Sequence, residues 1–147
     1  MKQYDIGIDL GTTSIIIATE EQGVVFRQPT IGAVDTRTNS ILAVGDEALK
    51  MVGRAPRTLT WCALRDGIIQ DHRMTNELIV RFVNQVCRSR IFKPRIAVCV
   101  PAAITGIEAD AVVESVMAAG ARQVYLVDEP VAAALGAGLQ IRQPHGC

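Results

Sequence analysis

The chain has 147 residues, which suffices for one globular domain or for a domain with a small inserted subdomain. Its composition, 49% hydrophobic and 20% charged, excludes a disordered tail, and no apolar run reaches the roughly 18 residues of a membrane-spanning helix. Fifteen basic residues balance fifteen acidic ones, so the zero net charge argues against a nucleic-acid partner, and the lack of an apolar leader predicts a cytoplasmic protein.

The first thirty residues predict two consecutive β-hairpins. Residues 4–10 alternate apolar with polar or small side chains, which is typical of a strand with one buried face. A tight turn at residues 11–13 leads into a β-branched run over residues 14–19, and a second turn leads into a strand over residues 24–26. We therefore expect three antiparallel strands at the start of the fold.

The segment between residues 30 and 65 has a different texture, with shorter apolar runs and more turn residues. It predicts two short strands, a short helix and a connector, over residues 31–34, 41–44, 46–52 and 53–60. We interpret residues 30–65 as a small inserted subdomain, and residues 1–29 together with 66–147 as the core subdomain that carries it.

Helices and strands alternate after residue 66. Residues 75–90 carry an apolar stripe at helical spacing. Residues 94–100 form a continuous apolar run, which is typical of a parallel strand covered on both faces. A further strand over residues 124–127 and an alanine-rich helix from Glu129 follow. The fold class is therefore α/β with a mixed sheet.

A capping box marks the start of the helix between these two strands. The side chain of Thr105 can accept from the amide of Glu108, and the Glu108 carboxylate can accept from the amide of Thr105. We expect this helix to end at Gly120 and to turn Ile107 and Val116 toward the core.

The cysteines and histidines predict no metal centre and no thiol catalysis. There is no C-x-x-C pair and no histidine cluster, and the four cysteines are widely spaced, at Cys62, Cys87, Cys99 and Cys147. Cys99 lies within an apolar strand and is interpreted as a small buried hydrophobic residue.

The turn at residues 11–13 is the first candidate site. Gly11 lets the backbone approach a ligand, and successive amide groups with the hydroxyls of Thr12 and Thr13 can hold an anion. Asp9, at the end of the preceding strand, can hold a hydrated Mg²⁺ beside it. The alternative is an ordinary polar hairpin turn. The chain has neither a P-loop nor a G-x-G-x-x-G motif.

Glu129 is the second candidate. It follows a buried strand and begins a helix, at the carboxyl edge of the sheet where α/β proteins bind ligands. A carboxylate there can orient a water toward a phosphate. The alternative is that the acidic residues Asp128 and Glu129 only cap the helix.

In combination, these motifs resemble those of the actin and heat-shock chaperone ATPase superfamily. Within it the chain is most similar to the MreB family of bacterial actins, which direct rod shape. The resemblance runs along nearly the whole chain, through motifs at residues 42–48, 53–56, 64–69, 93–95, 100–105, 119–122 and 129–139. The alternative is a fragment of a chaperone-type (DnaK-like) ATPase, but those proteins have a longer insertion where this chain has residues 30–65.

The resemblance implies an actin-like (ribonuclease H-like) ATPase fold, with three antiparallel strands followed by parallel β-α units. It implies ATP and Mg²⁺ as cofactors. Asp9 would hold Mg²⁺ through water, while Gly11, Thr12 and Thr13 would hold the ATP phosphates. Glu129 matches the catalytic position that aligns the attacking water in this family.

Members of this family are longer, and the chain stops before their second phosphate-binding hairpin and their adenosine-binding half. The resemblance thus implies the first half of a two-jaw fold, which we expect not to be a competent ATPase alone. The function implied is that of an ATP-binding, filament-forming cytoskeletal protein that controls cell shape by organising wall synthesis. The partners implied are further copies of itself, the inner membrane surface and the cell-wall elongation machinery.

A possible membrane contact comes from Ile91 and Phe92, which precede a proline and are expected on a loop. Cationic residues flank them, namely Arg88, Arg90, Lys93 and Arg95. Apolar side chains ringed by cations suit an anionic bilayer surface, and the resemblance implies the same contact, at the inner face of the cell membrane. The alternative is that Ile91 and Phe92 fold back onto the core.

Overall fold

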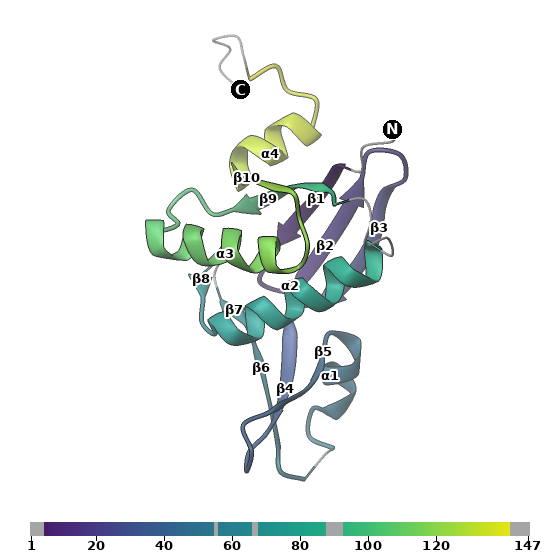
Figure 1. Ribbon diagram of the computed structural model, residues 1–147, viewed down its shortest axis with the longest axis vertical. Helices are drawn as coiled ribbons and strands as arrows, with labels where there is room; N and C mark the ends of the chain where they lie inside the picture. Colours follow the sequence, from purple (N-terminus) through teal and green to yellow (C-terminus); the bar gives the residue numbers. More distant parts are fainter. Residues whose placement is uncertain (1–4, 55, 66–67, 88–92, 142–147) are drawn as a thin grey trace.

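The computed structural model describes residues 5–54, 56–65, 68–87 and 93–141, which form a large sheet, a smaller sheet and the helices around them (Figure 1). The large sheet has the strand order β10-β9-β1-β2-β3. Its strands are β1 (Asp5–Leu10), β2 (Ser14–Thr19), β3 (Gly23–Pro29), β9 (Arg95–Val100) and β10 (Gln123–Asp128). β1, β2 and β3 pair antiparallel, whereas β9 is parallel to both β1 and β10. The predicted mixed α/β sheet is therefore confirmed.

One face of the large sheet forms the main hydrophobic core. Ile6 and Ile8 of β1 pair with Ile96 and Val98 of β9, and all four side chains are buried. Because side chains alternate along a strand, Cys99 faces the opposite side, where it is only half-buried. The expectation that this strand is covered on both faces is met fully on the core face and in part on the other, where Arg95, Ala97 and Cys99 are half-buried.

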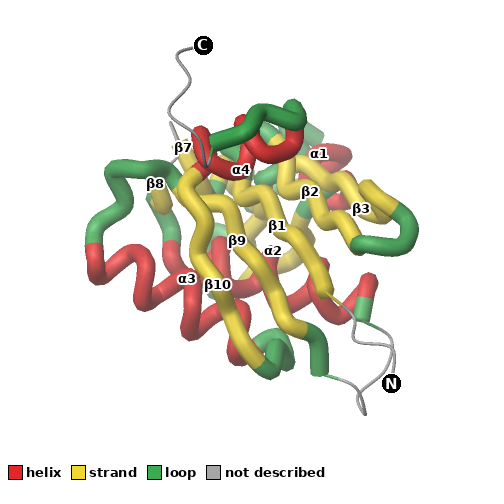
Figure 2. The backbone as a smooth tube through the Cα atoms, turned by 90° about the horizontal axis from the view of Figure 1, so that it is seen from above, coloured by secondary structure: helices red, strands yellow, loops and turns green. Residues whose placement is uncertain are grey.

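Helices lie on both sides of the large sheet. α2 (His72–Val86) and α3 (Gly106–Ala118) cover the core face, and Leu78, Ile79 and Phe82 of α2 are buried there. α4 (Glu129–Gly136) lies on the opposite side and packs against β9 and β10 (Figure 2). This placement leaves much of the second face of the sheet without a covering helix.

The predicted capping box of α3 is present. The amide of Thr105 donates to Glu108 Oε2 at 2.9 Å, and the amide of Glu108 donates to Thr105 Oγ1 at 3.3 Å. Hydrogen bonds from Thr105 lower the pKa of the Glu108 carboxyl, the one from its side chain having the larger effect. Ile107, however, is 81% exposed, so its predicted inward orientation is wrong. It lies in the first turn of the helix, whereas Val116 near the end is buried as expected.

The smaller sheet has the strand order β5-β4-β6. Its strands are β4 (Ile31–Asp35), β5 (Ile41–Val44) and β6 (Thr58–Cys62), with the short helix α1 (Asp46–Met51) packed on β4. We call residues 31–62 the small-sheet unit. The expected connector over residues 53–60 is corrected at its end, because β6 begins at Thr58. Beyond it, two short strands pair with each other, β7 (Leu64–Arg65) and β8 (Ile68–Ile69).

Exposed hydrogen bonds link the small-sheet unit to the rest of the chain at two places. Gln28 Nε2 donates to Asp46 Oδ2 at 2.9 Å, and the amide of Asp46 donates to Gln28 Oε1 at 2.8 Å. Arg73 of α2 donates from Nη1 to the carbonyl of Asn39 at 2.7 Å. The division of the chain into a core of residues 1–29 and 66–147 and an insertion of residues 30–65 stays a prediction of domain organisation.

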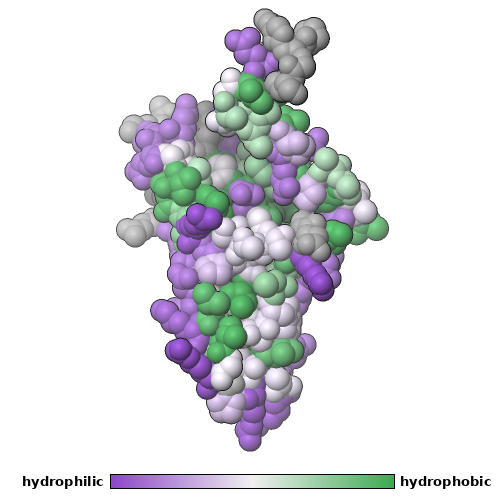
Figure 3. Space-filling model, turned by 180° about the vertical axis from the view of Figure 1, so that it is seen from behind, coloured by the Kyte–Doolittle hydropathy of each residue, from purple (hydrophilic) through white to green (hydrophobic). Residues whose placement is uncertain are grey.

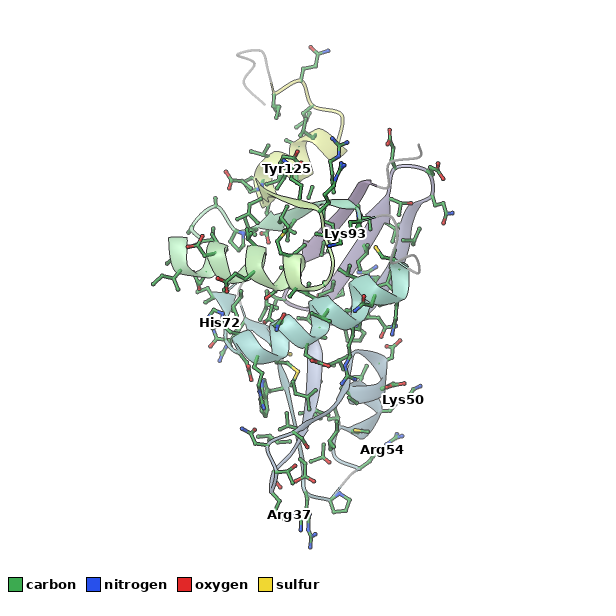
Figure 4. The ribbon with its side chains drawn as sticks, viewed as in Figure 1. Arg37, Lys50, Arg54, His72, Lys93 and Tyr125 are labelled. Carbon is green, nitrogen blue, oxygen red and sulfur yellow. The ribbon has the colours of Figure 1, made fainter. Side chains whose placement is uncertain are left out.

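The surface of the molecule is mixed in character. Arg37, Lys50 and Arg54 project from the small-sheet unit, at the opposite end of the molecule from Tyr125 on β10 (Figure 4). Seen from behind, apolar side chains form separate patches divided by polar ones (Figure 3). Among the residues that the structure describes, no helix has both the length and the apolar character needed to cross a bilayer. The predicted membrane contact, Ile91 and Phe92, lies outside the described residues.

Candidate functional site

The site is built around the turn of residues 11–13, which we call the β1–β2 turn. This turn reverses the chain between two antiparallel strands that pair from Leu10 and Ile15 onward. Gly11 is required by the close approach of the backbone, because a Cβ on it would lie 2.7 Å from the carbonyl oxygen of Ser14. Thr12 is half-buried and Thr13 is exposed, so the hydroxyls of both lie at or near the surface.

Asp9 lies one strand residue before this turn, on the face of the sheet opposite the main core. It is half-buried, and burial raises the pKa of its carboxyl above the usual value of 3.8. Its Cα pairs with that of Cys99 on β9, which in turn pairs with Val127 on β10. Asp9 thus lies in a row of paired residues that runs from Ile16 on β2 through Asp9 and Cys99 to Val127 on β10.

Glu129 lies near the β10 end of the same row, because it begins α4 directly after β10. It is half-buried, whereas Asp128 at the N-cap position is exposed and its side chain makes no capping hydrogen bond. The alternative in which both acidic residues serve only to cap the helix is therefore not supported for Asp128.

Cys99 lies between the two carboxylates in the register of the sheet, beside Asp9 on β1 and beside Val127 on β10, two residues before Glu129. Burial raises the pKa of its thiol most, and the negative charges of Asp9 and Glu129 raise it further. Both carboxylates therefore act on one point of the sheet surface, next to the β1–β2 turn. Cys99 is not the buried hydrophobic residue expected from sequence; its neighbours are set by the parallel register, which the sequence pattern does not show.

Thr30 is a residue of the site that sequence reasoning missed. It follows β3 and is only 1% exposed. Its hydroxyl donates to the carbonyl of Gly11 at 2.7 Å, and its amide donates to the carbonyl of Thr13 at 3.1 Å. A threonine between Pro29 and Ile31 carries no distinctive sequence signal, because its partners are nearly twenty residues away.

The donor set suits a hydrated divalent cation. Asp9, Glu129 and the hydroxyl of Thr12 offer oxygen ligands, which Mg²⁺ prefers. In the described part of the chain, no three His, Cys, Asp or Glu side chains group so as to hold a metal by themselves.

An open hollow of about 390 Å³ also exists on the uncovered side of the sheet. Its lining includes Gly7, Ala18 and Ala97, which lie toward the start of β1. The β1–β2 turn is at the other end of that strand. We therefore assign the candidate site to the turn and its carboxylates and not to the hollow.

The fold and this arrangement define an actin-like protein. MreB5 of Spiroplasma citri, in a crystal structure bound to ADP, matches 99% of this chain with a TM-score of 0.84 and 31% identity. A second crystal structure of that protein, bound to AMPPNP, matches equally well in TM-score at 30% identity. The MamK double helical filament matches with a TM-score of 0.78 at 17% identity, which supports the fold alone.

The chain belongs to the MreB/Mbl family. The family model for MreB/Mbl protein matches residues 3–147. Over 97% of its length the chain is 41% identical to the cell shape-determining protein Mbl of Bacillus subtilis, and over 99% it is 38% identical to the cell shape-determining protein MreB of Escherichia coli. It spans 43% and 44% of those two proteins, which is less than half of each.

Proposed function

We propose that this chain supplies one side of the nucleotide site of a filament-forming, cell-shape-determining protein, and that it binds ATP together with Mg²⁺. The observation that carries the proposal is the parallel register, which places Asp9 and the end of β10 before Glu129 on either side of Cys99, beside a glycine turn with two threonines. The solved MreB5 structures, which are bound to ADP and to AMPPNP, support the same ligand class.

In this proposal each residue has a distinct role. Asp9 holds hydrated Mg²⁺, and Gly11, Thr12 and Thr13 bind the phosphates through backbone amides and hydroxyls. Glu129 orients the water that attacks the terminal phosphate, which is the catalytic role of a carboxylate at that position. The bound Mg²⁺ supplies positive charge that stabilises the negative charge on the phosphates. Because Asp9 is half-buried, a cation beside it lowers the electrostatic cost of its ionised form.

The cellular role follows from the family. Relatives named as cell shape-determining proteins lead us to propose assembly with further copies of the same protein, in the cytoplasm at the inner face of the cell membrane. We also propose that Ile91 and Phe92 contact the membrane, that the cell-wall elongation machinery is a partner, and that residues 30–65 form an inserted subdomain. The chaperone-type alternative is not favoured, since the MreB/Mbl model covers residues 3–147.

Calorimetric titration of Mg·ATP into the chain tests the nucleotide proposal. We expect heat of binding that is weakened at least about tenfold by Asp9→Asn, which removes one charge without changing shape, a loss of about 1.4 kcal/mol. Asp110→Asn on the exposed surface of α3 is the matched control and should bind as the unchanged chain does. Equal binding by the Asp9 variant would contradict the assignment of the site to Asp9, and no binding at millimolar Mg·ATP would contradict binding by this chain alone, which spans less than half of its relatives.

A further inference from the structure

Thr30 joins three separate segments of the chain by hydrogen bonds. Its hydroxyl and amide hold the carbonyls of Gly11 and Thr13, as described above, and its own carbonyl accepts from the amide of Ala63 at 3.3 Å. Ala63 lies directly after β6, where the chain leaves the small-sheet unit. One buried residue therefore connects both ends of the β1–β2 turn to the two points where the chain enters and leaves the small-sheet unit.

The other polar contacts of the small-sheet unit differ from this one in two ways. The Gln28–Asp46 pair and the Arg73–Asn39 contact are exposed to solvent, where water competes for each hydrogen bond. Neither contact includes a residue of the β1–β2 turn. Thr30 is 1% exposed, and losing its hydroxyl removes a part-buried hydrogen bond to the carbonyl of Gly11. Displacement of the unit is therefore transmitted to the turn most directly through Thr30.

The geometry of the peptide group shows what Thr30 does to the turn. A trans peptide is planar, so the N–H of a residue points away from the carbonyl of the residue before it. When Thr30 holds the carbonyl of Gly11, the amide of Thr12 is directed to the opposite side. The carbonyl of Thr13 constrains the amide of Ser14 in the same way. Thr30 thus fixes the orientation of the Thr12 amide, which belongs to the proposed phosphate site, and of the Ser14 amide directly after the β1–β2 turn.

We propose that Thr30 is the positioning residue of the phosphate-binding turn and couples occupancy of that turn to the small-sheet unit. The proposal rests on the proposed nucleotide function. A phosphate bound by the oriented amides stabilises the turn geometry that Thr30 holds. By thermodynamic reciprocity, ligand binding then stabilises the attachment of the small-sheet unit, and a change in that unit alters ligand affinity.

The test compares two threonines. Thr30→Val removes the hydroxyl and keeps the branched shape, whereas Thr30→Ser keeps the hydroxyl. Thr75→Val is the matched control, because the Thr75 hydroxyl is equally buried but has no hydrogen-bond partner. In Mg·ATP titrations we expect about tenfold weaker binding for Thr30→Val, equivalent to about 1.4 kcal/mol, and near-normal binding for the other two variants. Equal affinity of folded Thr30→Val and the unchanged chain would overturn the proposal, as would failure of Thr30→Ser to restore affinity.

Amide exchange and NMR shifts separate this proposal from the nucleotide proposal. Without ligand, we expect Thr30→Val to shift the amide resonances of Thr12 and Ser14 and to accelerate exchange of the Ala63 amide, which donates to the Thr30 carbonyl, while Thr75→Val leaves all three unchanged. If the unchanged chain does not bind Mg·ATP but these amides respond, the nucleotide proposal fails and the positioning role stands. If they do not respond, the positioning role fails. If Thr30→Val does not fold, Thr30→Ser and Thr30→Ala are compared instead, because these two variants also differ by the hydroxyl group at this position.

Discussion

The large sheet and the small-sheet unit differ in how they are stabilised. The large sheet buries a continuous core of aliphatic side chains against α2 and α3. The separate buried cluster of the small-sheet unit consists of Ala33, Ala43 and Ala48, with Ile31 and Met51 packed beside it. Alanine buries little apolar area, so this cluster contributes far less free energy than the main core. The small-sheet unit therefore depends on its attachment to α2 and β3.

That difference predicts which part opens first. Regions with few buried apolar contacts and exposed hydrogen bonds exchange their amides by local opening, at less cost than global unfolding. The small-sheet unit has exposed hydrogen bonds and joins the main core through two buried side chains, Val34 and Val44, whereas β1 and β9 lie at the centre of the large sheet. A unit that opens at low cost is also one whose position a ligand can shift, since small differences in binding free energy suffice.

The largest effect is expected from the core of the large sheet. Leu78 on α2 is fully buried, and Leu78→Ala should lower the free energy of unfolding by about 2–5 kcal/mol through lost burial and the cavity left behind. Leu49→Ala on α1 is the control, because Leu49 is 51% exposed and should cost less than about 0.5 kcal/mol. Urea unfolding of both variants measures this, and equal losses would contradict the assigned difference between the two regions.

The next largest effect tests the attachment of the small-sheet unit. A Cβ on Gly32 would lie 1.9 Å from Sδ of Met74, which is fully buried, so Gly32→Ala should cost about 1–3 kcal/mol by overpacking. Gly7→Ala is the control on the open face, where an added Cβ meets nothing within 4 Å. It should be neutral or stabilise by about 0.4–1 kcal/mol.

Amide exchange then locates the effect of the glycine substitutions. We expect Gly32→Ala to raise exchange chiefly in β4, β5 and β6, because Gly32 lies on β4 within the small-sheet unit. A uniform rise across the large sheet would show that the unit does not open separately.

Removing a helix cap should give a smaller loss in the free energy of unfolding. α3 has a complete capping box, whereas α1 begins at Gly45 without a side-chain cap. Thr105→Ala should therefore cost about 1 kcal/mol. The pKa of Glu108 is lowered in the folded state, so its contribution is present above the usual value of 4.5 and is lost as the pH falls through the folded pKa. Thermal unfolding at pH 7 and pH 3 should show the cost of Thr105→Ala shrinking at the lower pH.

Sequence patterns predicted the large sheet well because its elements are defined by local periodicity. The alternation in β1 and the helical spacing in α2 follow from burial of one face, so each segment carries its own evidence. β6 was missed because its residues follow Gly53 and Pro56, and what makes them a strand is pairing with β4. Ile107 was misplaced because the capping signal fixes where α3 begins but not which side of its first turn faces the core.

Some residues of the candidate site could likewise be predicted from local sequence, and others could not. Asp9, Gly11 and Glu129 were found because each lies at the end of a strand next to a turn or a helix, which sequence reveals. Their roles stay predictions; the structure places Asp9 near the end of β1 and Glu129 directly after β10. Cys99 and Thr30 became part of the site only through long-range pairing and hydrogen bonds, which depend on the assembled fold.

The smallest effect contrasts one aspartate from each region. Burial raises the pKa of Asp9, whereas hydrogen bonds from the amides of Thr38 and Arg37, the first being the larger cause, lower the pKa of Asp35 in the small-sheet unit. Both shifts are measured from 3.8. Ionised Asp9 therefore costs stability above its folded pKa, and this cost disappears below the usual value. Asp35 contributes stability above the usual value, which is lost as the pH falls through its lower folded pKa.

Substitutions should reveal these opposite signs. At pH 7 we expect Asp9→Asn to raise the melting temperature of the ligand-free chain and Asp35→Asn to lower it. Both differences should shrink toward zero as the pH falls to about 3, because the carboxyls then become protonated. Melting curves across this range measure both effects. A higher melting temperature of Asp9→Asn together with weaker Mg·ATP binding would mean that Asp9 lowers the stability of the ligand-free chain, as expected for a residue retained for its ligand. A loss of stability at pH 7 would instead mean that Asp9 serves the fold.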